Sequence, residues 1–218
     1  SAALPVAGST QFSTGEEGTV LDVDRAVTLI HDALWSANSR VVNLSYNKVS
    51  APRPSLQNLQ ILLQQIIDAS GFDGITELYL RDLETNQEVH FAYQNKTLLQ
   101  EDIAFSGASV LKIPIMVSVY KNIEEPIPAE AAELIAAMID RSDNPPADKL
   151  MMDYINENTG PLLVSEDMNT LGLVNTFLAG YFYNGAPLLK TFATPANGRT
   201  DIFTSPDVYD QTTVAEMG

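Results

Sequence analysis

The sequence contains no cysteine and only two histidines among its 218 residues, and these shortages exclude several kinds of site. Without cysteine the chain can form no disulfide, no thiolate metal site and no cysteine nucleophile. His31 and His90 have no partner at metal-ligand spacing, so we expect each to be an ordinary surface or core histidine. We therefore predict neither a metal site nor a bound cofactor.

Basic residues and long apolar runs are also scarce. The chain has 12 Lys and Arg against 28 Asp and Glu, a formal charge of −16. Such a surface repels phosphates, so nucleic acid and anionic membranes are not expected partners. The most apolar stretch, residues 176–189, is broken by glycine, asparagine and proline, and no run approaches the ~18 residues of a membrane span. An apolar content of 45% fits a soluble globular protein with a real core.

The composition changes along the chain and predicts three parts. Residues 1–18 are rich in Gly, Ser, Thr and Glu and indicate a flexible arm. Residues 19–54 form a small N-terminal module that ends in the linker Ala51-Pro-Arg-Pro, which is stiff because each proline favours extended geometry in the residue before it. Residues 55–218 form the main domain.

Apolar periodicity and capping residues predict an α+β fold with a sheet that starts early and helices stacked on it. The expected helices run from Asp22 or Asp24 to about Trp35, from Ser55 to Ser70-Gly71, from Ser109 to about Asn122 and over Ala129–Arg141. A further helix can begin at Pro145-Pro146 and continue over Ala147–Glu157, and a short one is expected around Ser165–Leu171. The expected strands are Arg40–Val49, then Glu77–Leu83 and Glu88–Tyr93 as a hairpin. From Gly172 to Thr213 the chain is expected to be mostly loop.

The pattern Ser-x-x-Lys occurs three times, so the pattern alone identifies nothing. Ser45 and Lys48 lie on a predicted strand, where positions three apart face opposite sides. Ser118 and Lys121 share a helix face, but late in the helix, where no backbone N–H is free. Only Ser109 stands where the chain enters a helix, after three small residues. Unpaired N–H groups in a first turn favour developing negative charge.

Ser109 and Lys112 could therefore form a nucleophile with its own base. Lys112 lies one turn after Ser109, and apolar neighbours can desolvate its ammonium group. Burial lowers the pKa of a lysine, which makes a neutral amine available to take the serine proton. The alternative interpretation is a capping serine beside a lysine that extends over apolar surface.

A second polar element, Ser142-Asp143-Asn144, follows the next helix. A second hydroxyl near the lysine could pass a proton to a leaving group, and an amide side chain could bind a substrate carbonyl. Taken alone, Ser-Asp-Asn before two prolines is also ordinary turn chemistry. The prediction therefore depends on both elements together: a Ser-x-x-Lys at the start of one helix, followed by Ser-Asp-Asn after the next helix.

With both elements present, residues 55–218 resemble the penicillin-recognising serine enzymes, the class A β-lactamases and D-alanyl-D-alanine peptidases. The resemblance implies a β-lactamase-like antiparallel sheet with a helical lobe. It implies that Ser109 is acylated, that Lys112 is the general base or its partner, and that Ser142 protonates the leaving nitrogen. Asn144 would hold the amide side chain of the substrate, and the Ser109 N–H would be half of the oxyanion hole. Asp143 would fix the loop. Residues 16–50 resemble a small peptidoglycan-binding module.

Three departures from the family pattern limit what is expected. The interval from Lys112 to Ser142 is short, so part of the helical lobe is trimmed. The Glu-x-x-Leu-Asn loop used for deacylation is absent, and Glu166 is its only nearby substitute. No Lys-Thr-Gly strand follows, and Lys190-Thr191-Phe192 is a poor imitation of it. We expect the chain to be a fragment that lacks the C-terminal strands: truncated, clipped, or completed by another polypeptide or a swapped partner.

The expected function is that of a serine hydrolase which forms an acyl-enzyme at Ser109 with β-lactams or with D-alanyl peptides of the peptidoglycan stem. Without the expected glutamate, a peptidase or slow hydrolase is favoured over an efficient β-lactamase. The alternative is a non-catalytic peptidoglycan-binding protein with a degenerate β-lactamase fold. A third interpretation, chance motifs in an unrelated domain, requires Ser109, Lys112 and Ser142 to lie far apart. No signal peptide precedes Ser1, and we expect a bacterial envelope or secreted protein whose leader has been removed.

Overall fold

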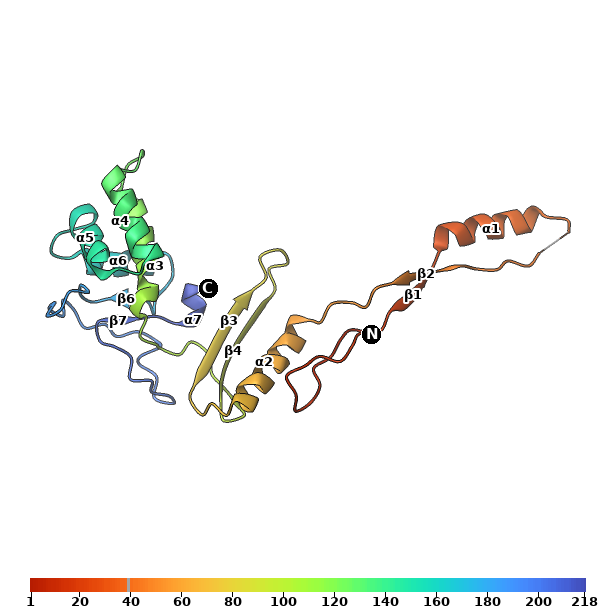
Figure 1. The fold of residues 1–218 in the computed structure, drawn as a ribbon, viewed down its shortest axis with the longest axis horizontal. Helices are drawn as coiled ribbons and strands as arrows, with labels where there is room; N and C mark the ends of the chain where they lie inside the picture. The colour runs from red at the N-terminus through yellow and green to blue at the C-terminus, as the bar shows by residue number, and fades with distance from the viewer. Residues whose placement is uncertain (39) are drawn as a thin grey trace. The chain divides into compact units, whose positions relative to one another are not determined.

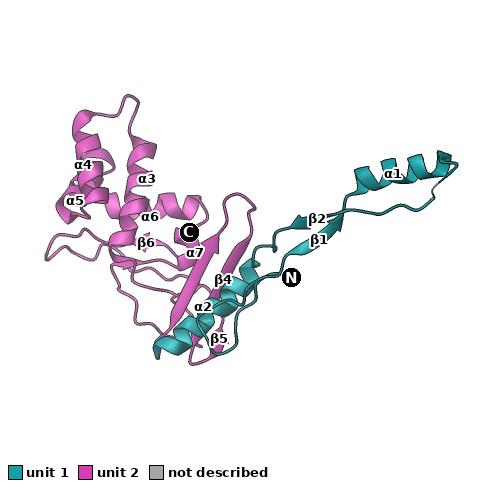
Figure 2. Cartoon of the chain, turned by 45° about the vertical axis from the view of Figure 1, so that its right-hand side comes forward, with its two compact units in different colours: residues 1–74 teal, residues 75–218 magenta. Residues whose placement is uncertain are grey.

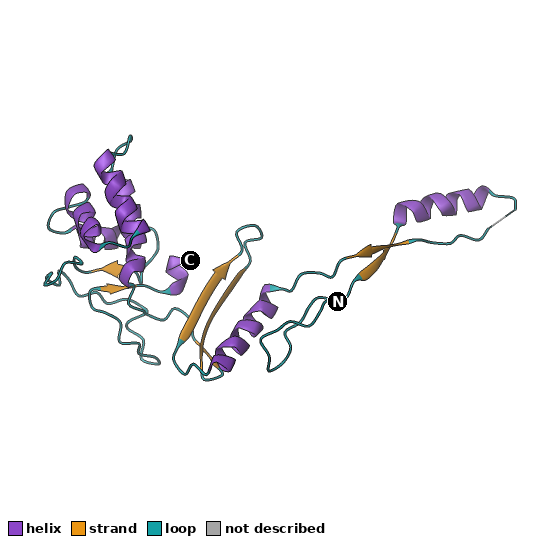
Figure 3. Cartoon of the chain, in the orientation of Figure 1, coloured by secondary structure: helices purple, strands orange, loops and turns teal. Residues whose placement is uncertain are grey.

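The computed structural model describes residues 1–38 and 40–218, which form two compact units, residues 1–74 and 75–218 (Figures 1 and 2). Helices and small antiparallel sheets make up both units, so the predicted α+β class is correct (Figure 3). The helix that follows Ser55, which the sequence assigns to the main domain, belongs to the first unit. None of the described helices is long and apolar enough to span a membrane.

The first unit contains a two-stranded sheet and two helices. Strands β1 (Gly18–Leu21) and β2 (Tyr46–Val49) pair antiparallel, and helix α1 (Val23–Trp35) lies between them in the sequence. The Asp22 carboxylate accepts the Arg25 N–H at 3.1 Å, so Asp22 rather than Asp24 caps α1. The strand predicted over residues 40–49 is shorter than expected, because its partner β1 offers only four residues.

Helix α2 (Leu56–Ser70) begins and ends as its sequence predicts. The Ser55 hydroxyl accepts the Asn58 N–H at 3.2 Å, which satisfies one of the free donors of the first turn. Gly71 ends the helix in the left-handed region at φ 71°, a conformation that glycine adopts without a Cβ clash.

The second unit begins with a three-stranded antiparallel sheet. Its strands β3 (Thr76–Arg81), β4 (Glu88–Gln94) and β5 (Thr97–Leu99) lie in the order β3-β4-β5. The predicted hairpin is present, with Arg81 opposite Glu88. Its first strand, β3, ends at Arg81 rather than at the predicted Leu83. Asp82 explains the difference, because its carboxylate accepts the Glu84 N–H at 2.8 Å and starts the turn there.

Four helices follow the sheet and build the main core. They are α3 (Lys112–Asn122), α4 (Ala129–Asp140), α5 (Asn144–Tyr154) and α6 (Gly160–Thr170), with the short 3₁₀ turn η1 (Ala108–Leu111) before α3. Fully buried side chains on all four helices pack together: Ile115, Val119, Met138, Leu150, Met151 and Val164. Helix α6 begins earlier than predicted, because Pro161 is tolerated in a first helical turn.

The last part of the chain is mostly irregular, as predicted, but it contains three short elements. Strands β6 (Phe177–Leu178) and β7 (Asp210–Gln211) pair antiparallel, and α7 (Val214–Met217) follows. Phe105 and Thr212 exchange both backbone hydrogen bonds at 3.0 Å. This bridge holds the end of the chain beside the residues that lead into η1.

Candidate active site

Ser109 stands at an accessible position in front of a buried lysine. It is the second residue of η1, and α3 starts only at Lys112, so the prediction of one helix that begins at Ser109 needs correction. A 3₁₀ turn takes the place of the first α-turn, and its first residue, Ala108, has a left-handed backbone at φ 45°. Ser109 is exposed, whereas Lys112 is 2% exposed.

The Lys112 side-chain nitrogen contacts the other three predicted site residues. Its Nζ lies 3.1 Å from Ser109 Oγ and 3.3 Å from Ser142 Oγ. It also lies 2.8 Å from the Ser142 carbonyl oxygen and 2.7 Å from Asn144 Oδ1. The chance-motif interpretation required these groups to be far apart, and the structure instead brings them to one nitrogen atom.

The contacts of Lys112 suit a neutral amine. The Ser142 carbonyl and Asn144 Oδ1 can only accept, and they are the two nearest atoms, so two N–H groups satisfy them. A neutral amine then keeps a lone pair for a hydroxyl proton. Ser109 Oγ, at 3.1 Å, is placed to donate to it. A neutral Lys112 can therefore accept a proton from Ser109.

Two opposing electrostatic effects act on the pKa of Lys112, and only the first favours the neutral amine. Burial lowers the pKa of Lys112, because the charged form loses water, while attraction to Asp143 and Asp148 opposes the shift. Asp143 is itself paired with Arg141 at 3.0 Å on the surface. Burial raises the pKa of Asp148, against the stabilising effect of the N–H groups of Phe182 and Tyr183.

The loop before Ser109 is held by the last part of the chain. Asp210 Oδ1 accepts the Ala108 N–H at 2.8 Å, and Ser106 Oγ accepts the Asp207 N–H at 2.6 Å. Burial raises the pKa of Asp210, while its backbone partners lower it. A left-handed alanine costs on the order of 1–3 kcal/mol, and these contacts over-determine the backbone there.

The backbone N–H of Ser109 could form part of an oxyanion hole, the site that stabilises a negative oxygen. Within the described residues, the N–H of Ser109 makes no hydrogen bond, whereas the N–H groups on either side, of Ala108 and Val110, are both bonded. An unpaired N–H on the nucleophile itself lies next to the carbon that the hydroxyl would attack. It can therefore stabilise the negative oxygen of a tetrahedral intermediate.

The Ser142-Asp143-Asn144 loop has a defined geometry. Ser142 lies in the left-handed region at φ 59°, which turns the chain between α4 and α5. Helix α5 begins at Asn144, one residue before the predicted start at Pro145-Pro146, and both prolines lie in its first turn, where proline is tolerated. Asp143 contacts Arg141 and no site hydroxyl among the described residues, in keeping with its expected role in fixing the loop.

Two residues near Lys112 escape prediction from the sequence. The buried Asp148 carboxylate accepts the Phe182 N–H at 2.7 Å, and the Phe182 ring centroid lies 5.2 Å from Lys112 Nζ. Asp148 lies one turn after Asn144 in α5, but its partner is 34 residues away on an irregular segment. The hydrogen bond between Asp148 and Phe182 becomes apparent only in the folded structure, where this segment lies against α5.

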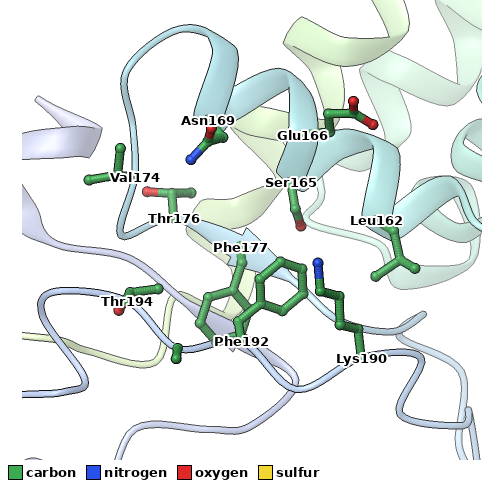
Figure 4. Close-up of a pocket in the computed structure, with 11 residues that line it drawn as sticks. Leu162, Ser165, Glu166, Asn169, Val174, Thr176, Phe177, Lys190, Phe192 and Thr194 are labelled. Atoms are coloured by element: carbon green, nitrogen blue, oxygen red, sulfur yellow. The ribbon is translucent and has the colours of Figure 1, made fainter.

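Glu166 and Lys190, the substitutes considered for missing family elements, lie elsewhere. Both line a cavity of about 550 Å³ between α6, β6 and residues 190–194 (Figure 4). None of Ser109, Lys112, Ser142 and Asn144 is among the described residues that line it. Lys190 Nζ lies 4.8 Å from the centre of the Phe192 ring. Neither side chain contacts the four site residues within the described chain.

The other two Ser-x-x-Lys pairs have different surroundings. The hydroxyl of Ser118, on a residue with no exposed surface, and the ammonium of Lys121 both bind the Asp167 carboxylate, which ties α3 to α6. Lys121 is thus ion-paired with Asp167. Ser45 Oγ is buried and has no hydrogen-bond partner within the described residues.

The histidine in the sheet is hydrogen-bonded. His90 Nε2 lies 2.8 Å from Glu77 Oε1, and the Glu77 carboxylate also accepts the N–H groups of Asp102 and Ile103 at 2.8 and 3.0 Å. Glu77, His90 and Asp102 have ligand atoms close enough for a metal ion. Because both Glu77 oxygens already have donors, the cluster serves to anchor residues 102–103 to the sheet.

A scan against protein-family models finds no match for this chain, and a search of curated proteins finds no significant match.

Proposed function

We propose that residues 75–218 form a β-lactamase-like serine acyl-transfer domain of a bacterial envelope protein. It would react through Ser109 with β-lactams or with D-alanyl peptides. The observation that carries the proposal is Lys112, which is almost fully buried and lies 3.1 Å from an exposed serine hydroxyl. The free N–H of Ser109 and the Ser142 hydroxyl at 3.3 Å from Lys112 support it.

The acylation step follows from these contacts. Neutral Lys112 takes the proton of Ser109 as the oxygen bonds to the substrate carbonyl carbon, and the carbonyl oxygen becomes an oxyanion at the Ser109 N–H. Lys112 then gives a proton to Ser142 Oγ, which gives its own proton to the amide nitrogen. The carbon–nitrogen bond breaks, and an ester on Ser109 and a free amine remain.

The described residues around Lys112 favour a long-lived ester. The groups that contact Lys112 are hydroxyls, a carbonyl, an amide and the Phe182 ring, and Glu166 lines another cavity. A carboxylate placed to activate water beside Ser109 is not found among them. We therefore favour a peptidase or slow hydrolase over an efficient β-lactamase.

A fluorescent penicillin tests the proposal in the natural full-length protein. Covalent label is expected on the wild type and absent from Ser109→Ala, because the Ser109 hydroxyl, 3.1 Å from Lys112 Nζ, is the proposed nucleophile. Ser45→Ala is the matched control, since it removes a hydroxyl from the same motif that has no hydrogen-bond partner. Label should persist through gel electrophoresis, and mass spectrometry should place it on Ser109.

Two results would contradict the acyl-enzyme proposal: no covalent label on the folded wild type, or equal labelling of Ser109→Ala. A protein that is not labelled but sediments with purified peptidoglycan would instead fit the non-catalytic binding alternative. Rapid release of label would indicate β-lactamase activity.

The sheet edge supports a further partner proposal. In the order β3-β4-β5, β3 has no neighbouring strand on one side within the described residues. A cavity of about 390 Å³ lies beside Tyr79, Val110 and Thr213, and Thr213 Oγ1 is buried without a partner. Helix α7 also contacts β3 and contributes Val214 and Met217 to this groove. A strand edge without a paired strand, beside an apolar groove, favours strand addition. We propose that a strand from a second copy or another polypeptide completes the sheet here.

Sedimentation over a range of concentrations tests pairing between copies. A dimer is expected at high concentration, and Leu80→Lys on β3 should weaken it, because an edge charge opposes strand pairing. Leu98→Lys on β5, at the other edge of the sheet, is the control. A monomer at every concentration would leave only another polypeptide as the partner.

A further inference from the structure

The cavity beside α6 is lined by Glu166 and Lys190, two charged residues that the proposed acyl transfer does not use. Its volume of about 550 Å³ lies within the usual ~300–1,000 Å³ of small-molecule pockets. Glu166 belongs to α6, and Lys190 belongs to the irregular segment on the opposite wall (Figure 4). The cavity is a second candidate site, separate from the one at Ser109.

The hydroxyl groups in the cavity wall already have partners within the protein. Ser165 Oγ accepts the Leu178 N–H at 2.8 Å. Thr194 Oγ1 accepts a hydrogen bond from Gln211 Nε2 at 2.9 Å, and the Thr176 hydroxyl is also bonded inside the fold. These three hydroxyls therefore hold the wall together and are not free for a ligand.

Three other polar side chains in the wall have no hydrogen bond or ion pair among the described residues: Glu166, Asn169 and Lys190. Glu166 and Asn169 are three residues apart on α6, so they lie on the same side of the helix. The Lys190 ammonium points toward α6 from the opposite wall (Figure 4). The cavity thus offers one negative charge, one positive charge and one amide to a ligand.

An aromatic pair forms much of the apolar wall. Phe177 and Phe192 stack with their ring centroids 4.6 Å apart and an angle of 11° between the rings. The Lys190 ammonium lies 4.8 Å from the Phe192 ring centroid, where the ring attracts the positive charge. A ligand that binds Lys190 therefore has an apolar surface next to its charged group.

We propose that this cavity binds a free amino acid with an apolar side chain. The carboxylate of the ligand pairs with Lys190, and its ammonium group binds the Glu166 carboxylate and Asn169 Oδ1. Its side chain packs against the Phe177–Phe192 pair. A zwitterion satisfies both charges in the wall, whereas a simple carboxylate or a simple amine leaves one of them without a partner. The inference does not depend on acyl transfer at Ser109.

The test titrates phenylalanine into the natural full-length protein with ¹³C-labelled leucine and valine methyl groups. The methyl resonances of Leu162 and Val174, which line the cavity, should shift. Those of Leu150 and Val119, which are fully buried in the helical core and do not line it, should not. Absence of a shift at Leu162 and Val174 with millimolar phenylalanine would overturn the inference.

Three related ligands test the chemistry of the site in the same titration. N-acetylphenylalanine lacks the ammonium group, phenylalanine amide lacks the carboxylate, and glycine lacks the apolar side chain. Each should bind on the order of tenfold more weakly than phenylalanine, because each loses one of the proposed contacts. An affinity for any of the three that equals the affinity for phenylalanine would contradict the proposed binding mode.

Two variants assign the two charges of the ligand. Glu166→Gln should lose the preference for phenylalanine over N-acetylphenylalanine, and Lys190→Met should lose the preference over phenylalanine amide. Both residues are exposed, and their matched controls, Glu133→Gln and Lys48→Met, are exposed residues that do not line the cavity. Unchanged preferences in Glu166→Gln and Lys190→Met would refute the assignment.

Ser109→Ala separates this inference from the proposed acyl transfer. It should bind phenylalanine as tightly as the wild type, because Ser109 does not line this cavity. Phenylalanine binding by a wild type that no β-lactam labels would retain this site and refute acyl transfer. Labelling of Ser109 in a protein that does not bind phenylalanine would refute the amino acid site alone.

Discussion

At the scale of single residues, the environment of Lys112 decides what Ser109 can do. The side chain is buried among acceptors, and desolvation lowers its pKa while Asp143 and Asp148 work against that shift. A base must be neutral to accept a proton, so the rate of acylation should rise with pH as Lys112 loses its charge.

Asp143→Asn provides a test with a defined sign. The negative charge of Asp143 raises the pKa of Lys112, so its removal should lower that pKa and move the rising limb of the acylation rate to lower pH. The measurement is the second-order labelling rate against pH. Asp140→Asn is the control, because Asp140 is exposed and has no charged contact in the described chain. A limb that moves to higher pH would contradict this assignment.

The predictability of the site also depends on single residues. Ser109, Lys112, Ser142 and Asn144 could be selected from the sequence because short-range spacing and helix ends place them. Asp148, Phe182 and Asp210 could not, because their roles depend on hydrogen bonds that span 34 and 102 residues. No local pattern encodes such contacts.

At the scale of elements, capped helices with periodic apolar faces were predictable, as α2 between Ser55 and Gly71 shows. The two-residue strands β6 and β7 were not, because their pairing arises from the packing of an irregular segment. The 3₁₀ turn before α3 also escaped prediction. Its first residue, Ala108, has a left-handed backbone, which alanine does not normally favour and which the sequence therefore does not indicate.

The link between α3 and α6 gives a stability prediction. Asp167→Ala removes the acceptor of the buried Ser118 hydroxyl and should lower the free energy of unfolding by about 1–3 kcal/mol. Asp167→Asn should cost less, because its amide oxygen still accepts. Urea unfolding measures both, with the exposed Glu133→Ala as control. Equal stability of Asp167→Ala and wild type would show that the link contributes nothing.

At the scale of the whole molecule, a charge of −16 implies strong self-repulsion. Raising NaCl from about 10 mM to about 150 mM shortens the Debye length from about 30 Å to about 8 Å. The melting temperature should therefore rise, by roughly 2–4 °C if screening contributes about 1 kcal/mol. Calorimetry at constant pH measures the change. A lower melting temperature at 150 mM would show that attractive surface pairs dominate instead.

Helix α3 and the turn before it contain the same four-residue motif twice, with opposite outcomes. Ser109 and Lys112 meet at 3.1 Å, with two neutral oxygens as the nearest neighbours of Lys112, whereas Ser118 and Lys121 are both bound to Asp167. The two copies thus differ in what surrounds the lysine: neutral acceptors at Lys112 and a carboxylate ion pair at Lys121. Residues far along the chain therefore determine what a Ser-x-x-Lys motif becomes, because the carboxylate that binds Ser118 and Lys121 comes from α6, 49 and 46 residues away.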